Sequence, residues 1–298
     1  MVNILLVLLG VLFLYYLFFF VRDIIAHKSD LGGGNIVISG VIGAICNFLD
    51  TLGIGSFAPT TLCLNATKQL KSDKLLPGTL NVSCTIPVML EAFLFITVVE
   101  VDGVTLFALI IAAIAGAAVG GKLVPKLPEK KVQTYLGIAL LITVVFMAGK
   151  QLGLMDFLGT GNTALGLTGV KLVVAVLLNF IFGALMTIGC GLYAPCMAMV
   201  YMLGLNPIIA FPVMMGSCAA LMPVASKEFI VVGDYARKVS LGIAIGAVPG
   251  VIIAAKFVTN LDMNILTWLI IVAITYTSIT YIRKGLKAPA AEAVTEEK

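Results

Sequence analysis

Nine apolar stretches follow one another along the chain, most of them near the length of about 20 residues that a helix needs to cross a bilayer. Of the 298 residues, 60% are hydrophobic and only 11% are charged, and the mean hydropathy is +1.12. A soluble domain carries roughly 25% charged residues, so a soluble enzyme, a disordered chain, a coiled coil and a disulfide scaffold are excluded. We expect an all-α polytopic membrane protein. Seven stretches predict single spans: 3–21, 75–99, 104–121, 134–149, 207–225, 239–257 and 265–282.

The other two stretches, 36–67 and 171–203, are too long for one helix and are interrupted near their middle. The interruptions are LGIGSFAP (52–59) and IGCGLYAP (188–195). Proline lacks a backbone donor and glycine loosens a helix. Each stretch therefore predicts two shorter helices joined by a non-helical elbow. An elbow at membrane depth is tolerated only where it is buried in protein or lines a cavity.

The distribution of lysine and arginine predicts which loops are cytoplasmic, because cytoplasmic loops are enriched in these residues. Successive spans cross the membrane in alternating directions without conflict if each interrupted stretch enters and leaves on one side. For 36–67 that side is the cytoplasm, and for 171–203 it is the outside. This predicts a multi-pass protein of the inner (plasma) membrane with an external N-terminus and a cytoplasmic C-terminus. The basic segments are 22–28, 68–74, 122–131, 227–238 and 283–287, and the poorly basic ones are 100–103, 151–169, 203–206 and 258–264.

The second half of the chain repeats the first at a shift of 136 positions (195 − 59 = 136). The basic loop 68–74 then corresponds to the uncharged loop 203–206 on the opposite face, so the two repeats are expected to be inverted. Inverted repeats with broken helices near the midplane are the plan of secondary transporters. The aligned pairs are Gly53 and Gly189, Gly55 and Gly191, Phe57 and Tyr193, Pro59 and Pro195, and Pro87 and Pro223.

Two small-xxx-small pairs also correspond in the two halves, Gly116 with Gly120 and Gly246 with Gly250. Such pairs let helices approach closely, and we expect them to serve packing alone.

Five parts are expected along the chain. The first stretch lacks the basic start and the A-x-A exit of a signal peptide, so it predicts a retained helix. The parts are an N-terminal transmembrane helix and loop (1–30), membrane repeat 1 (31–150), an external linker (151–169), membrane repeat 2 (170–287) and a disordered cytoplasmic tail (288–298).

The duplicated Gly-x-Gly…Ala-Pro elbows, the chain length and the two-half hydropathy resemble the TauE/SafE sulfite exporter family, also called the toluene sulfonate uptake permease family. The resemblance covers roughly Gly32 to Arg283. Many members have a further glycine after Gly-x-Gly, where this chain has Ser56 and Leu192. The resemblance implies export or uptake of a small sulfur-containing anion such as sulfite or an organosulfonate, and in some members of other small organic acids.

The two elbows are the expected substrate site, because the N-termini of half-helices offer free amide donors to an anion. Glycines let the backbone approach the ligand, and hydroxyls add donors. Phe57 and Tyr193, at equivalent positions before the prolines, either line or gate the pocket or serve packing alone. The alternative is that glycine and proline only permit a kink between packed helices. The candidate residues are Gly53, Gly55, Ser56, Pro59, Thr60, Gly189, Gly191, Tyr193 and Pro195.

Ionisable residues inside apolar segments are costly and so are functional candidates. Asp50 and Glu91 are the expected sites of proton or ion coupling, and Lys227, the repeat partner of Glu91, is an expected anion ligand. A Glu91–Lys227 pair across the repeat axis is one possibility. The alternatives are that Lys227 extends to the membrane edge beside Glu228 and that Asp50 caps the elbow.

Other function classes have less support in the sequence. The six cysteines form no CxxC pair, so neither a metal nor a disulfide is expected. A thiol enzyme using Cys190 or Cys196 would need a nearby base, and the single histidine, His27, lies outside the apolar stretches. The LGGGN segment follows no strand, so no nucleotide cofactor is expected. A net charge of +4 does not indicate nucleic acid.

The expected partners are a small anion and the lipid bilayer, with a homo-oligomer left open. A passive anion channel would keep the repeat but needs a continuous polar lining. The lysines at 68, 71 and 74 predict topology rather than an anion vestibule.

Overall fold

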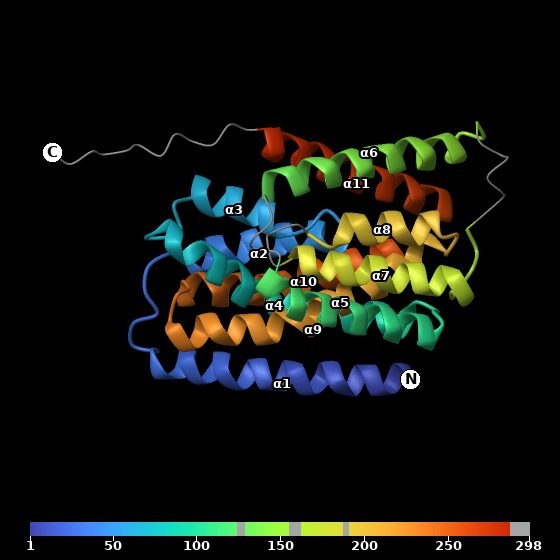
Figure 1. The fold of residues 1–298 in the computed structure, drawn as a ribbon. Coiled ribbons are helices and arrows are strands. Elements are labelled where there is room, and N and C mark those ends of the chain that lie inside the picture. Colours follow the sequence, from blue (N-terminus) through green and yellow to red (C-terminus); the bar gives the residue numbers. More distant parts are fainter. Residues whose placement is uncertain (124–128, 155–161, 187–190, 287–298) are drawn as a thin grey trace.

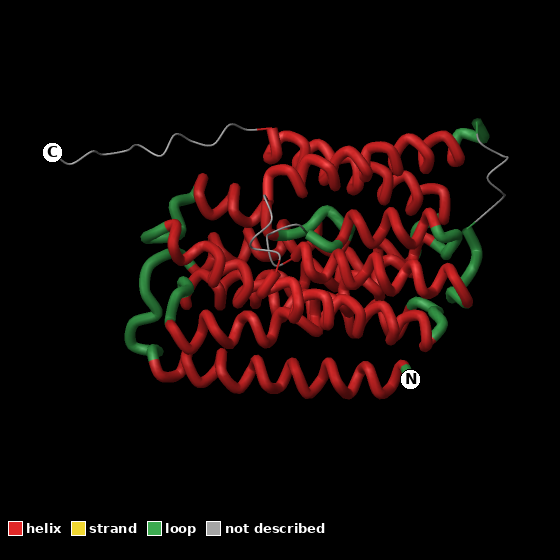
Figure 2. Tube along the Cα trace, viewed as in Figure 1, coloured by secondary structure: helices red, strands yellow, loops and turns green. Residues whose placement is uncertain are grey.

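The computed structural model describes residues 1–123, 129–154, 162–186 and 191–286, with eleven α-helices among them. Apart from a single bridge between Ala164 and Leu205, no β-structure occurs in these ranges (Figure 2). The helices are α1 (Val2–Ala26), α2 (Ile36–Thr51), α3 (Phe57–Ala66), α4 (Leu76–Val98), α5 (Gly103–Leu123), α6 (Glu129–Gln151), α7 (Gly169–Met186), α8 (Tyr193–Met202), α9 (Ala210–Val232), α10 (Arg237–Thr259) and α11 (Met263–Leu286), with 3-10 turns at Asp73–Leu75 and Pro207–Ile209.

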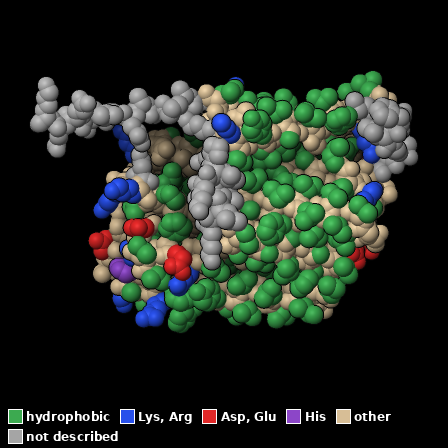
Figure 3. Space-filling view, in the orientation of Figure 1, with side chains coloured by type: hydrophobic (Ala, Val, Ile, Leu, Met, Phe, Trp, Pro, Cys, Tyr) green, Lys and Arg blue, Asp and Glu red, His purple; other side chains and the backbone are tan. Residues whose placement is uncertain are grey.

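Eight of these helices are long and apolar enough to cross a membrane, namely α1, α4, α5, α6, α7, α9, α10 and α11. They lie roughly parallel in Figure 1. Hydrophobic side chains cover the middle of the face in Figure 3, and most charged ones gather at the end where α3 lies. Exposed residues such as Val7, Leu177 and Ile253 show that the apolar surface faces outward, as a lipid environment requires. The expectation of a polytopic all-α membrane protein is confirmed.

Both interrupted stretches form the two helices that the sequence predicts. Figure 1 shows α2 running from one end of the bundle to its middle and α3 returning to the same end, while α7 and α8 do so from the other end. Asn35 starts α2, since its side chain accepts from the amides of Val37 and Ile38 over 2.9 and 3.2 Å. The two hairpins therefore approach the middle of the bundle from opposite ends.

Helix pairing across the two halves is reciprocal. The second-half helix α10 packs along α2, and the first-half helix α5 packs along α7 in the same way. The helices α4 and α9 pack against each other, as do α6 and α11. Two copies of one five-helix unit would produce this pattern, and the expected repeat stays a prediction.

Small residues make these pairings close. A Cβ atom on Gly246 would overlap the carbonyl oxygen of Gly40 in α2, and one on Gly116 would overlap that of Phe180 in α7. Gly250 and Gly120 approach Ala44 and Ala184 in the same two helices. The backbones thus touch where any side chain would hold them apart, which agrees with the packing role expected for the small-xxx-small pairs.

The shift in sequence between corresponding packing glycines of the two halves differs from the shift between the elbow prolines. Gly43 of α2 meets the backbone of Ile243, and Gly183 of α7 meets that of Ala113. These two glycines are 140 positions apart (183 − 43 = 140), four more than the elbow prolines. The first repeat therefore has one helical turn more between its packing glycine and its elbow, because a turn is 3.6 residues.

The central helices α4 and α9 carry the core. Phe95 of α4 stacks on Phe211 of α9 with ring centroids 5.0 Å apart, and both rings are fully buried. The Thr85 and Ser226 hydroxyls join the same helices over 2.8 Å. On their outer side α1 packs against both, and its Tyr16 hydroxyl donates to the Val82 carbonyl over 2.7 Å.

Candidate functional site

The first elbow lies between α2 and α3 and is built on two glycines with left-handed backbone. The amides of Gly53 and Ile54 turn back to the carbonyls of Asp50 and Leu49 over 2.7 and 3.2 Å, which ends α2. Gly53 and Gly55 have φ of +89° and +90°, a conformation that glycine adopts without strain. The chain can therefore reverse within five residues and begin α3 at Phe57.

The two prolines that the shift of 136 aligns lie inside the first turn of the short helices, Pro59 in α3 and Pro195 in α8. The first four amides of a helix have no partner within that helix, so a proline there removes no hydrogen bond. At the first elbow Gly53 and Gly55, rather than Pro59, make the break in the chain.

The carboxylate of Asp50 lies at the start of α3. Its Oδ1 accepts the backbone N–H of Ser56 over 2.7 Å, and the residue is 2% exposed. The Ser56 hydroxyl and the Tyr193 hydroxyl of α8 lie near enough to this carboxylate to interact with it electrostatically. Asp50 thus joins the elbow of the first half to the short helix of the second.

Gly53 forms a second contact between the two hairpins. A Cβ atom on Gly53 would lie 3.0 Å from the sulfur and 3.1 Å from the methyl carbon of Met197 in α8. Gly55, in contrast, has no heavy atom within 4 Å of the corresponding position, so it borders open space. The elbow is closely packed on one side and unfilled on the other.

Glu91 of α4 lies fully buried beside the end of α2. The Thr51 hydroxyl donates to its Oε1 over 2.6 Å and also contacts the Asn47 carbonyl over 2.8 Å. Among the described residues, Glu91 Oε2 and Asn47 Oδ1 have no hydrogen-bond partner. The Glu91 and Asp50 carboxyls are close enough for their charges to interact.

The remaining first-elbow candidates line the same region. Ser56 is buried, and its hydroxyl lies 3.6 Å from the Cys84 sulfur. Thr60 is fully buried beside Cys46. Both residues therefore face protein rather than lipid.

The second elbow is described only in part, because Gly189 falls in 187–190, outside the described residues. Gly191 is exposed, and its carbonyl accepts from the Tyr281 hydroxyl of α11 over 3.2 Å. Tyr193 is half-buried and Pro195 is buried. Of the second-half candidates, Tyr193 is thus the residue that reaches the first elbow.

Lys227 lies away from the elbows. Its ammonium pairs with the adjacent Glu228 over 2.8 Å and is partly exposed near the end of α9. The structure does not bring Lys227 to Glu91, whose hydrogen-bond partner is Thr51. This placement matches the alternative in which Lys227 extends to the membrane edge, because the two residues lie at different depths of α4 and α9.

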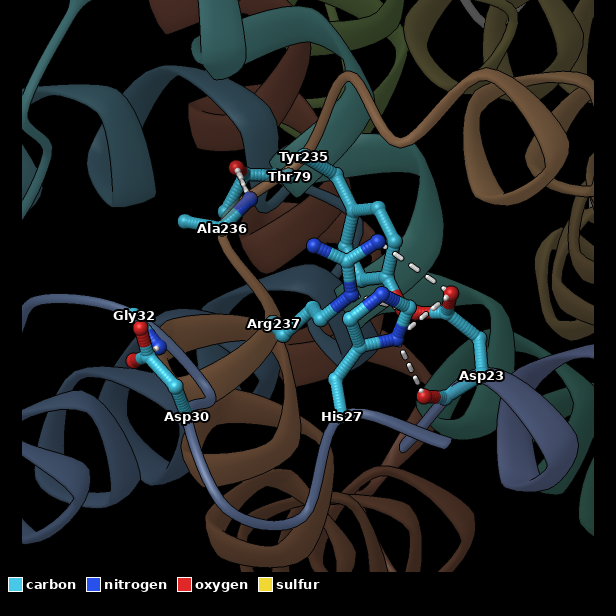
Figure 4. A network of polar contacts seen from close by, with 8 residues as sticks. All are labelled: Asp23, His27, Asp30, Gly32, Thr79, Tyr235, Ala236 and Arg237. Carbon is cyan, nitrogen blue, oxygen red and sulfur yellow. Dashed lines mark hydrogen bonds and ion pairs between the residues drawn. The ribbon is translucent and has the colours of Figure 1, made fainter. Parts of the chain in front are cut away.

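A polar network that sequence reasoning missed lies at the basic end of the bundle (Figure 4). The Asp23 carboxylate of α1 accepts from Arg237 over 2.6 and 3.2 Å and also from the Tyr235 hydroxyl. His27 Nδ1 lies 3.3 Å from the same carboxylate. Burial, followed by the hydrogen bond to Asp23, raises the pKa of Tyr235 above its ordinary value. No sequence signal links residues 214 positions apart.

A cavity of about 420 Å³ opens beside this network. It is lined by the 29–33 loop, by Lys71, whose side chain lies against Gly33, and by residues 233–237. The lining includes acidic Asp30 as well as Lys71, and its Arg237 is paired with Asp23 of α1.

Eight spanning helices and two broken-helix hairpins that meet inside the bundle define a multi-pass membrane protein of transporter-like architecture. Comparison of the chain with protein-family models, with curated proteins and with solved structures finds no match. The resemblance to the TauE/SafE family stays a prediction from the residues.

Proposed function

We propose that this chain is a secondary transporter of a small anion and that the two elbows form its substrate site. The observation that carries the proposal is the approach of the two hairpins, in which Met197 lies against Gly53 and the Tyr193 hydroxyl interacts with the Asp50 carboxylate. Secondary transporters bind substrates near the midplane, at broken helices contributed by both repeats. The reciprocal pairing of α2 with α10 and of α7 with α5 supports an inverted repeat and hence alternating access.

The proposed binding surface is the unfilled side of the first elbow. Gly55 borders open space, and the start of α3 offers amide donors and the positive end of a helix dipole. The Ser56 hydroxyl adds a donor from the same segment. Lys227 has no part in this site, because its ammonium is bound to Glu228.

For the substrate we propose a small sulfur-containing anion such as sulfite or an organosulfonate, as the family resemblance implies, with export as the proposed direction. A small carboxylate is the second candidate, because the Asp50 carboxylate itself occupies the start of α3. Asp50 and Glu91 are the proposed coupling residues, since each is a carboxyl buried at membrane depth.

Anion binding to the purified protein tests this proposal directly. A ligand that binds only the folded state raises the melting temperature, so sulfite, thiosulfate, short sulfonates, short carboxylates and chloride are compared at several pH values. A selective shift with sulfur-containing anions supports the first candidate, and a shift with carboxylates alone supports the second.

Substitution of Gly55 by leucine locates the site. The new side chain fills the open space beside the elbow and should abolish the shift and transport into proteoliposomes. Gly10→Leu in α1 is the matched control, because Gly10 also has no heavy atom near its Cβ position but lies far from the elbows in sequence. Wild-type transport by the Gly55 variant would reject the elbow as the site. Accumulation above the external concentration under a pH gradient separates a transporter from a passive channel.

A further inference from the structure

The Asp50 carboxylate is bound in the way an anionic substrate is expected to be bound. It accepts the Ser56 amide over 2.7 Å at the start of α3, and hydroxyls of Ser56 and Tyr193 complete its contacts. Backbone amides at a helix start, with hydroxyls from a facing helix, are a typical anion-binding arrangement. The start of α3 is therefore already occupied by a carboxyl group, and that group belongs to the chain.

Among the residues that the structure describes, none supplies a fixed cation beside Asp50. The titratable groups that interact with it are Cys46 of α2, Cys84 and Glu91 of α4, Tyr193 of α8 and Cys218 of α9. In the part of the chain that the structure describes, no lysine, arginine or histidine is among the groups that act on this carboxylate. Its charge is held by hydrogen bonds and by the dipole of α3.

A second anion at the same amides would lie against the first. Two anions a few Å apart in a site of low polarity repel each other strongly. A neutral, protonated carboxyl removes this repulsion and turns one acceptor oxygen into a donor. The fully buried Glu91 Oε2, which has no partner among the described residues, is a further acceptor within this charge neighbourhood.

We propose that Asp50 is a tethered competitor for the transported anion, so that the anion binds together with one proton. Ionised Asp50 occupies the Ser56 amide and the Tyr193 hydroxyl. A proton taken from the aqueous side to which the elbow opens neutralises the carboxylate, which frees both donors for the substrate. Proton and anion then cross together, and both are released when Asp50 ionises again and reclaims the donors. This inference rests on the proposed function and adds how the movement of the anion is coupled to that of a proton.

The decisive experiment counts protons during anion binding to the full-length protein. The probe is methanesulfonate, which keeps its charge from about pH 5 to about pH 8, so any pH dependence belongs to the protein. Calorimetry in buffers of different ionisation enthalpy should show uptake of one proton per bound anion above the titration of Asp50. The dissociation constant should rise about tenfold per pH unit there.

Two variants assign the proton to its residue. Asp50→Asn keeps the size of the side chain without a charge, and its binding should take up no proton and no longer depend on pH. Glu91→Gln tests the other proposed coupling carboxyl, which does not contact the Ser56 amide, and uptake that persists in this variant assigns the proton to Asp50. Asp102→Asn is the control, because this carboxyl bonds to Thr105 at the start of α5 and has no part in the proposed site. Loss of uptake in the Glu91 variant with retention in the Asp50 variant overturns the inference.

The remaining outcomes are also distinct. Anion binding by the wild type without proton uptake overturns the competition but leaves the proposed transport function standing, even if the Asp50 variant fails to fold. A folded Asp50→Asn protein that binds no anion makes Asp50 a support of the elbow and overturns the competition. Absence of binding by the wild type at every pH, with every anion tested, overturns the proposed function as well.

Discussion

The Thr51 hydroxyl donates to the Glu91 carboxylate over 2.6 Å, which joins the end of α2 to α4 across 40 positions of sequence. Both residues are fully buried. The hydrogen bond thus fixes the end of α2 to the central helix α4. This position is two residues before Gly53, against which Met197 lies.

Substitution of Thr51 by valine should lower the free energy of unfolding. Glu91 would lose its hydrogen-bond donor in a buried position, and an unsatisfied buried group of this kind costs about 1–3 kcal/mol, more when it is charged. Thr97→Val in α4 is the control, because Thr97 is exposed and bonds only to its own helix. Equal unfolding free energies for the two variants, measured in detergent, would contradict this prediction.

Because α2 packs closely on α10, we expect that even one added methyl group at a contact glycine destabilises the fold. Gly246→Ala places a Cβ on the Gly40 carbonyl and should destabilise the fold by about 1–3 kcal/mol. Gly116→Ala should cost a similar amount at the reciprocal α5–α7 contact. Gly10→Ala in α1 meets open space and should not destabilise. Thermal unfolding compares the three, and tolerance of the Gly246 change would show that the helices are farther apart than described.

The Asp23–Arg237 pair should tie α1 to the rest of the bundle. A double-mutant cycle with Asp23→Asn and Arg237→Gln is expected to give a coupling free energy of about 1.5–3 kcal/mol, since the guanidinium donates two bonds to a half-buried carboxylate. The same cycle at the exposed Lys227–Glu228 pair should give no measurable coupling. An Asp23–Arg237 coupling near zero would mean that the other contacts of α1, which include the Tyr16–Val82 hydrogen bond, hold it in place.

Asp102 predicts one source of acid sensitivity outside the membrane. The Thr105 amide and hydroxyl, which bond to Asp102 Oδ2 over 2.8 and 2.7 Å at the start of α5, lower the pKa of this carboxyl from its ordinary value. A lowered folded-state pKa means that the stabilisation is present above the unfolded-state pKa, about 3.9, and is lost as the pH falls through the folded-state value.

Replacement of Asp102 by alanine should therefore cost about 1 kcal/mol at neutral pH, as removal of a helix cap does. The variant should lose less stability than the wild type as the pH falls below about 4. Melting curves over that range measure the difference. Parallel curves for the two proteins would assign the acid sensitivity to other groups.

Topology offers a further test that is independent of stability. The basic loops predict that a reporter after Lys298 lies in the cytoplasm and one after Leu152 lies outside. Fusions to alkaline phosphatase, active only outside, and to a fluorescent protein, fluorescent inside, report the two sides. Both reporters on one side would reject the inverted arrangement.

The sequence by itself determined which segments form helices and where those helices break. The stretch expected at 3–21 became α1 (Val2–Ala26), and the elbow at 52–59 lies between α2 and α3. These features depend on the need to satisfy backbone groups in an apolar environment and on the conformational limits of glycine and proline, which adjacent residues set.

The contacts that give the site its chemistry were decided by the tertiary structure. Lys227 and Glu91 share a repeat position, yet they have different partners, Glu228 and Thr51. The shift of 140 between packing glycines, the Asp23–Arg237 pair and the contact of Tyr193 with Asp50 likewise have no local signature. Such pairs form only when helices distant in sequence pack side by side, because the rotation and depth of each helix decide which side chains meet.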